Sequence, residues 1–190
     1  NKYKMAIIGQ TANLAPADKK IYALRDVTAT VDSIPLIASS ILSKKIASGA
    51  DAIVLDVKVG SEAFMKSLTD AKKLARTMVE IGNSLNRKTI AVITNMNQPL
   101  GYAVGNANEV EEAIQILQNK GANDETEVVL TIAAYMAILG GAFTDFTVAY
   151  EQLSILLQNG QAISKFRELI EIQGGESTLI DEIDKLPQAK

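Results

Sequence analysis

The sequence predicts an α/β fold in which a parallel or mixed sheet is flanked by helices. Two apolar runs rich in β-branched residues, 51–61 and 88–95, have the composition of buried parallel strands. Apolar residues recur at helical spacing over 62–86, between the two runs, and again over 108–121. This strand–helix–strand–helix order predicts parallel pairing, because the crossover helix returns the chain to the end of the sheet at which the first strand began.

Three further elements are expected before the first of these runs. The apolar segment 4–9 ends in glycine and is predicted to form a buried strand. Pro16 and Asp18 are typical of a helix start. A second helix is expected between Pro35, in its first turn, and Gly49, at its C-terminal cap. Apolar residues cover most of the circumference of that helix, so it is expected to pack on several sides.

The C-terminal third of the chain is predicted to be helical. Residues 125–141 form a strongly apolar stretch, and 146–160 and 162–175 form two shorter ones. The polar residues 176–190 are expected to be a linker or the beginning of another element.

Composition excludes several classes of function. The 190 residues include no Cys and no His, which excludes thiol and Ser-His-Asp catalysis and sites with Cys or His metal ligands. A net charge of −3 with 5% aromatic residues gives no indication of a nucleic-acid partner. No apolar run reaches the roughly 18 residues of a membrane span. We therefore expect a cytoplasmic protein that binds neither nucleic acid nor membrane.

Ser40 and Lys44 are an unusual polar pair on the apolar helix. They are four residues apart and so point the same way. Arg25 precedes this helix, separated from it by chain that is expected to be extended, and could fold back to add a fork of donors. Such a set suits a small flat ligand with several carbonyl acceptors. The residue types alone favour another arrangement, in which Lys44 extends into solvent and Arg25 pairs with Asp26 or Asp32.

The carboxyl end of the first strand offers a second candidate site, because ligands of open parallel sheets bind at this edge. Asp56 and Lys58 share one face of the strand and are either a salt bridge or part of a ligand site. Gly60 and Ser61 precede a helix, a geometry that can hold an anion on backbone N–H groups. A plain turn is the simpler expectation, because neither the Walker A nor the dinucleotide-binding glycine motif is present.

Two segments of the chain carry a specific resemblance to a known family. Residues 23–45 read ALRDVTATVDSIPLIASSILSKK, and residues 96–114 read MNQPLGYAVGNANEVEEAI. Both closely resemble the pyrimidine-nucleoside phosphorylases, a family that includes thymidine phosphorylase, and the likeness extends over about residues 4–175. The resemblance implies a transferase of pyrimidine salvage. Such an enzyme cleaves a pyrimidine nucleoside with inorganic phosphate to give the free base and a ribose or deoxyribose 1-phosphate.

The resemblance also implies which residues bind the base. In the family, the Arg of the ALRD motif and the Ser and Lys of the SSILSKK motif hold the pyrimidine ring; these are Arg25, Ser40 and Lys44 here. Arg25 and Lys44 would stabilise negative charge that develops on the base as the glycosidic bond breaks. No catalytic residue is assigned within this chain, because the family's active-site His and its phosphate-binding Lys-x-Ser-x-Gly-Gly region lie upstream of the matching segment.

A cation site is implied as well. Family members bind a monovalent cation, expected to be K⁺, through two backbone carbonyls and a carboxylate that correspond to Leu100, Ala103 and Glu112. Whole members are homodimers, and no organic cofactor is expected. The sequence departs from the family at Glu62, where Gly is usual, and at Asn95, where Asp is common. Glu62 adds a charge near the phosphate side of the site.

The resemblance divides the chain, as a central fragment, into four parts. Residues 1–16 would form a strand and connection of the α/β domain, and 17–48 a helical segment of the base-binding α domain. Residues 49–175 would form the α/β phosphate-side domain, and 176–190 a linker toward a C-terminal α+β domain. We expect the fragment alone to be inactive.

Two alternatives to this function remain open from the sequence. One is a phosphoribosyltransferase of the same fold, which should carry an acidic, Mg²⁺-linked pyrophosphate site. The other is a non-catalytic domain for ligand binding or assembly. If the fragment is isolated, apolar surface is expected around Ile34, Ile37 and Ile41, and hence dimerisation or rearrangement.

Overall fold

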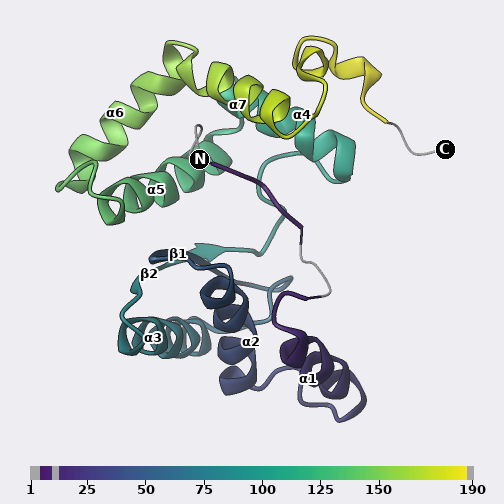
Figure 1. Cartoon of the computed structure of the whole chain (residues 1–190), viewed down its shortest axis with the longest axis vertical. Coiled ribbons are helices and arrows are strands. Elements are labelled where there is room, and N and C mark those ends of the chain that lie inside the picture. The colour runs from purple at the N-terminus through teal and green to yellow at the C-terminus, as the bar shows by residue number, and fades with distance from the viewer. Residues whose placement is uncertain (1–4, 10–12, 188–190) are drawn as a thin grey trace. The chain divides into compact units, whose positions relative to one another are not determined.

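The chain forms two compact units (Figure 1). The computed structural model describes residues 5–9 and 13–187. The first unit, called here the sheet unit, contains Gly9–Gln98 and Tyr135–Thr144. The second, called the helical unit, contains Asn1–Ile8, Pro99–Ala134 and Asp145–Lys190. Each unit is described separately.

The sheet unit is built on two parallel strands. β1 (Ala52–Val59) pairs with β2 (Lys88–Asn95), with Ala52 opposite Lys88 and Val59 opposite Asn95. α3 (Leu68–Ser84) connects the strands and packs against both of them. The predicted α/β fold with a parallel sheet is therefore confirmed, and both strands lie within the predicted runs.

The core of the sheet unit lies on one face of the strands. Ile53, Leu55 and Val57 alternate along β1 and are buried, as expected for a strand with one covered face. They pack with Met78 of α3 and Leu42 of α2 (Ile34–Ala47). Figure 1 shows α2 and α3 on the same side of the two strands. This packing fixes the position of α2, which carries Ser40 and Lys44.

The position of Arg25 differs from the prediction. Arg25 lies in the last turn of α1 (Pro16–Val27), and residues 28–33 form turns rather than extended chain. The Thr28 hydroxyl and the Thr28 N–H both bond the Leu24 carbonyl at the helix end. Ala29 then adopts a left-handed φ of 54°. These bonds at the end of α1 start a turn. The β-branched residues that follow favour strands, but no strand lies beside them in the described part of the chain, so they do not form one.

The exposed apolar surface is also not where the sequence placed it. Ile37 is only 7% exposed, and Ile34 and Ile41 pack against the core. That expectation is wrong because α2 contacts α3 within this chain. The exposed apolar side chains of this region belong to α1 instead: Ile21, Tyr22, Leu24 and Val27.

The predicted strand 4–9 is not formed in its described residues, 5–9. Lys4 lies outside the described residues. A strand needs a neighbouring backbone, and Ile7 instead bonds a side chain: its N–H donates to Gln173 Oε1 at 2.8 Å, and its carbonyl accepts from Gln173 Nε2 at 2.7 Å. The amide of Gln173 thus takes the place of a strand partner for one residue.

The helical unit contains the elements that follow β2. They are α4 (Asn106–Leu117), α5 (Asn123–Leu139, whose last turn belongs to the sheet unit), α6 (Phe146–Gln158) and α7 (Gln161–Ile172). Two short 3₁₀ turns, Ser177–Ile180 and Ile183–Lys185, occupy the expected linker, and Ile180 is buried there. None of the helices in the described residues has the length and apolar content needed to cross a bilayer.

Gly60, directly after β1, gives a first testable prediction. Its φ is 150°, and a Cβ at this position would lie 2.4 Å from the backbone carbon of Met96. Gly60→Ala is expected to lower the free energy of unfolding by about 2–4 kcal/mol, because backbone atoms would have to move. The urea midpoint measures this. Gly49→Ala is the control, since Gly49 also has a positive φ of 82° but open space around it; an equal loss in both variants would contradict the steric explanation.

Candidate functional site

Lys44 is held by two side chains in the sheet unit. Its ammonium donates to Asp18 Oδ2 at 2.5 Å and to Ser40 Oγ at 2.9 Å. Lys44 is 30% exposed, whereas Asp18 is 9% exposed and Ser40 is buried. The arrangement in which Lys44 simply extends into solvent is therefore wrong, and the predicted shared direction of Ser40 and Lys44 is confirmed.

Asp18 supplies the negative charge of this cluster. Burial acts to raise the pKa of its carboxyl, but hydrogen bonds from Lys44 and Ser40 and the positive charges of Lys44 and Arg25 outweigh it. The pKa of Asp18 is therefore lower than the ordinary value of 3.8. Asp18 lies in the first turn of α1, where the helix dipole also favours a carboxylate. At neutral pH the cluster holds an ionised carboxylate.

Arg25 is a buried cation that forms no direct ion pair among the described residues. It is 3% exposed, and the ion pairs of the described residues do not include it. Its guanidinium donates from Nε to the Thr30 carbonyl at 3.4 Å and from Nη2 to the Val31 carbonyl. It also lies 5.1 Å from the ring centroid of Tyr22. The pairing with Asp26 or Asp32 that residue types favoured is not formed.

These four residues form one polar cluster in the sheet unit. Arg25 and Lys44 both act electrostatically on Asp18, so the two cations belong to one cluster. The cluster combines two cations, one hydroxyl and one carboxylate at the junction of α1 and α2. The two cations exceed the single carboxylate of the cluster, and this balance favours a ligand that is, or becomes, anionic. The donors of the cluster are of the kind that a small ring with several acceptors would need.

At the carboxyl end of the two strands, the candidate polar groups bond one another. Lys58 pairs with Asp56 at 2.6 Å, so the salt-bridge interpretation of this pair is confirmed. Thr94 of β2 also donates to Asp56, at 2.5 Å. In the turn after β1, the Ser61 N–H donates to Asn97 Oδ1 at 3.0 Å and the Glu62 N–H to the Met96 carbonyl at 3.2 Å. These N–H groups are already bonded, which supports a plain turn over an anion site.

Glu112 organises a loop of the helical unit. It lies on α4 and is 7% exposed. Its Oε1 accepts the Tyr102 N–H at 2.7 Å and its Oε2 accepts the Ala103 N–H at 3.1 Å. The structure thus places the backbone of Ala103, one of the residues expected at the cation site, in contact with Glu112. Carboxylate and backbone carbonyl oxygens are the donors that hard cations prefer.

Glu125, on α5, lies beside Glu112. Its Oε2 is buried and has no hydrogen-bond partner among the described residues. Burial raises the pKa of the Glu125 carboxyl, and the charge of Glu112 and a side-chain hydrogen bond with Glu112 raise that pKa further. Within the described part of the chain, no group of three or more acidic side chains gathers as a metal site, so any cation here needs other oxygen donors.

The sequence alone did not identify Asp18 as the partner of Lys44, or Glu125 as the neighbour of Glu112. Asp18 was seen only as a helix-start residue. Its spacing from Arg25, seven residues or two helical turns, was a usable signal, because it places both on one face of α1. No comparable signal pointed to Glu125, because its partner Glu112 lies on a different helix.

Comparison with known families identifies the fold. The model of the glycosyl transferase family, a/b domain, matches residues 1–163. The chain belongs to this family. The cluster on α1 and α2 and the loop around Glu112 both lie inside the matched part of this glycosyl transferase domain.

Curated relatives refine the likeness of the glycosyl transferase domain. The whole chain is 56% identical over 189 residues to the pyrimidine-nucleoside phosphorylase of Bacillus subtilis and 55% identical over 190 residues to that of Geobacillus stearothermophilus. It is 56% identical over 190 residues to that of Staphylococcus aureus. In each case the match covers 100% of this chain and 44% of the relative. The chain thus spans less than half the length of these relatives.

Proposed function

We propose that the polypeptide containing this chain is a pyrimidine-nucleoside phosphorylase. It cleaves a pyrimidine nucleoside with inorganic phosphate to the free base and a ribose or deoxyribose 1-phosphate. One observation carries the proposal: the buried Arg25 and the Ser40–Lys44 pair lie in one electrostatic cluster. These are the positions that the resemblance assigned to the base. The names of the relatives support the same reaction.

The base-binding residues act on the leaving group. A uracil or thymine ring offers two carbonyls and an imide N–H, and Arg25, Ser40 and Lys44 offer complementary partners. The bond between C1′ of the sugar and N1 of the base breaks, and its electron pair moves onto the base. Phosphate oxygen forms the new bond to C1′. Arg25 and Lys44 stabilise the negative charge on the departing base, which is greater in the transition state than in the bound nucleoside.

The remaining parts of the site are proposed outside this chain. The residues that bind phosphate are placed upstream, and no organic cofactor takes part. Closure about a hinge then brings base and phosphate together and excludes water. The whole protein is proposed to be a cytoplasmic homodimer that acts in pyrimidine salvage, and the isolated chain to be inactive.

A cation site is part of the proposal. Leu100 and Ala103, through their carbonyls, and Glu112, through its carboxylate, would hold K⁺ in the helical unit. The observation that supports it is the close association of this loop with the buried Glu112 carboxylate. A cation held there would supply a fixed positive charge beside Glu112.

The experiment is a phosphorolysis assay on the full-length polypeptide with uridine and thymidine. Loss of nucleoside absorbance is expected only when phosphate is present, with one pentose 1-phosphate formed for each free base. Release of the base from a pyrimidine nucleoside 5′-monophosphate with pyrophosphate and Mg²⁺, with no cleavage of nucleosides in phosphate, would establish the phosphoribosyltransferase alternative. Binding of pyrimidines without turnover would establish a non-catalytic domain.

A further inference from the structure

The hydroxyl of Ser40 has one proton, and its neighbours determine where that proton points. The Lys44 ammonium can only donate, so the hydroxyl oxygen is the acceptor in the 2.9 Å bond between the two side chains. The Ser40 proton therefore points away from Lys44. A serine inside a helix often donates to the carbonyl four residues earlier, but the hydrogen bonds of the described part of α2 include no such bond from Ser40.

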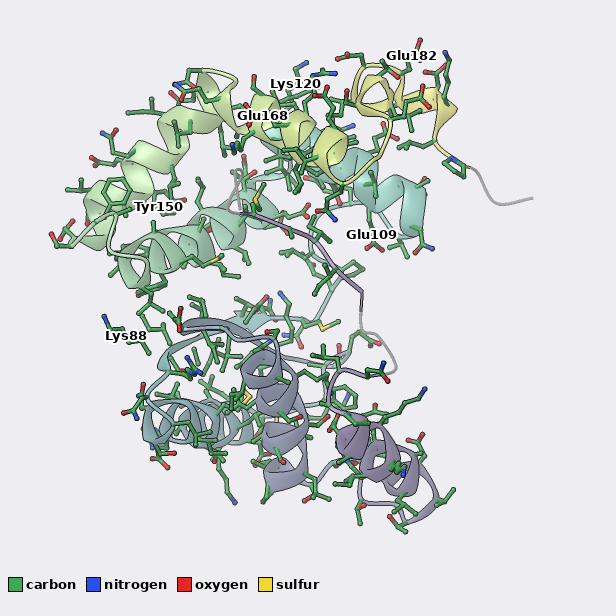
Figure 2. All side chains as sticks on the ribbon, in the orientation of Figure 1. Lys88, Glu109, Lys120, Tyr150, Glu168 and Glu182 are labelled. Atoms are coloured by element: carbon green, nitrogen blue, oxygen red, sulfur yellow. The ribbon has the colours of Figure 1, made fainter. Side chains whose placement is uncertain are left out.

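Asp18 is the acceptor toward which the Ser40 proton turns. α1, which carries Asp18, lies against α2, which carries Ser40 and Lys44 (Figure 2). The Asp18 carboxylate lies 2.5 Å from the same ammonium that bonds Ser40. Burial acts to raise the pKa of Asp18, but hydrogen bonds from Lys44 and from Ser40 lower it. A donor stabilises the ionised carboxylate, so Ser40 gives its proton to Asp18.

The hydrogen-bonding groups that remain have a fixed direction. Ser40 uses its proton for Asp18 and one lone pair for Lys44, which leaves one lone pair as an acceptor. Lys44 donates two of its three N–H groups within the cluster and keeps one. Arg25 has donors only, and its two bonds to backbone carbonyls leave other N–H groups unused. The cluster thus offers a ligand one acceptor, at Ser40, and donors at Lys44 and Arg25.

This pattern complements an imide. A uracil or thymine ring presents a carbonyl, the N3–H group and a second carbonyl in a row, which are acceptor, donor and acceptor. Cytosine has a bare N3 in place of N3–H and an amino group in place of one carbonyl. Its N3 lone pair would face the lone pair of Ser40, and its amino protons would face a cation. Polar groups left unpaired in a buried site weaken binding strongly.

We propose that Asp18 sets the base specificity of the site by holding the Ser40 hydroxyl as a hydrogen-bond acceptor, so that the cluster binds imide bases and rejects cytosine. The inference rests on the proposed function, because it takes Arg25, Ser40 and Lys44 as the residues that bind the base. It adds Asp18, which acts through Ser40 and Lys44 without contacting the base. Asp18 is therefore a positioning residue.

Asp18→Asn tests the proposal, because it replaces one carboxylate oxygen by an NH₂ donor in a side chain of the same shape. That donor can bond Ser40 and turn the Ser40 proton outward. Calorimetric binding of free uracil and cytosine to the full-length polypeptide, with inorganic phosphate present, gives the ratio of the two Kd values. The wild type is expected to prefer uracil about 10²-fold or more, and Asp18→Asn to lower that ratio about tenfold or more. Asp26→Asn, at an exposed position of α1, is expected to keep the wild-type ratio.

Two further variants separate the direction of the hydroxyl from stability. Asp18→Glu keeps a carboxylate and is expected to keep the preference for uracil. Ser40→Ala removes the hydroxyl and is expected to lower the ratio by itself, so adding Asp18→Asn to it should change the ratio no further. A purely structural role of Asp18 would weaken the binding of both bases alike. A wild-type ratio in Asp18→Asn or in Ser40→Ala would overturn the proposal, as would an effect of Asp18→Asn that persists without the hydroxyl.

Binding of the free bases does not depend on turnover. If nucleosides are cleaved with phosphate and Asp18→Asn keeps the wild-type ratio, the role of Asp18 fails and the phosphorylase proposal stands. If uracil is preferred through Asp18 but no nucleoside is cleaved, the role of Asp18 stands and the phosphorylase proposal fails. A wild type that binds uracil no better than cytosine would overturn the role of Asp18 directly.

Discussion

Replacement of Lys44 by alanine is expected to lower kcat/KM for phosphorolysis by about 10²- to 10³-fold in the full-length polypeptide. The ammonium is already positioned by Asp18 and Ser40, at 2.5 Å and 2.9 Å. It therefore needs little reorganisation to meet the charge that develops on the base. Its loss removes an interaction that is stronger in the transition state than in the ground state, so the larger part of the effect should appear in kcat.

The matched control is Lys45→Ala. Lys45 is the next residue of α2, so its side chain leaves the helix about 100° away from that of Lys44. Initial rates with uridine and thymidine, at saturating phosphate, measure both variants. Comparable losses in the two would show that Lys44 acts through the stability of α2. Unchanged kcat/KM in Lys44→Ala would remove Lys44 from the base site.

The elements that the sequence predicts well are those whose signal is local. The strands β1 and β2 are short β-branched runs, and their burial pattern is fixed by the α3 connection between them. The helices α6 and α7 follow directly from their apolar spacing. In each case one segment and its immediate neighbours contain all the information that the prediction needs.

The predictions that were wrong depended on partners distant in sequence. An apolar run such as 5–9 becomes a strand only beside another strand, and here Ile7 bonds the side chain of Gln173. The exposure of Ile37 was misjudged because its burial depends on α3, more than thirty residues later. Periodicity reports which face of a helix is apolar, not which element will cover that face.

The candidate sites show the same limit. Ser40 and Lys44 were found because helical spacing alone places them together. The buried position of Arg25 and the carboxylate that balances its charge depend on how α1 packs against α2. The position of Glu125 beside Glu112 depends on how α4 and α5 are placed around the loop at Gly101. The two residues lie on different helices, so their spacing in the sequence does not predict that they are close.

Asp18→Asn is expected to reduce kcat/KM about tenfold or more, although Asp18 is proposed to position Lys44 rather than to contact the base. Without the carboxylate, the Lys44 ammonium loses its 2.5 Å partner and samples other rotamers. Asp18→Glu is expected to recover part of the rate, which a general loss of stability would not explain. Asp26→Asn, at an exposed position of the same helix, is the control.

The loss of stability caused by Asp18→Asn is expected to depend on pH, and its direction follows from the pKa of Asp18. The folded-state pKa of Asp18 lies below its ordinary value of 3.8, because its hydrogen bonds and the neighbouring cations outweigh burial. The ion pair therefore contributes stability that is fully present above the ordinary pKa and is lost as pH falls through the lower, folded-state value. Asp18→Asn should unfold at lower urea than wild type at neutral pH, by about 1–2 kcal/mol for a partly exposed pair. The difference should vanish in strong acid, where wild-type Asp18 is protonated as well. A difference in stability that persists unchanged into acid would show that Asp18 contributes through its shape and not through its charge. The ion pair would then not explain the orientation of Lys44.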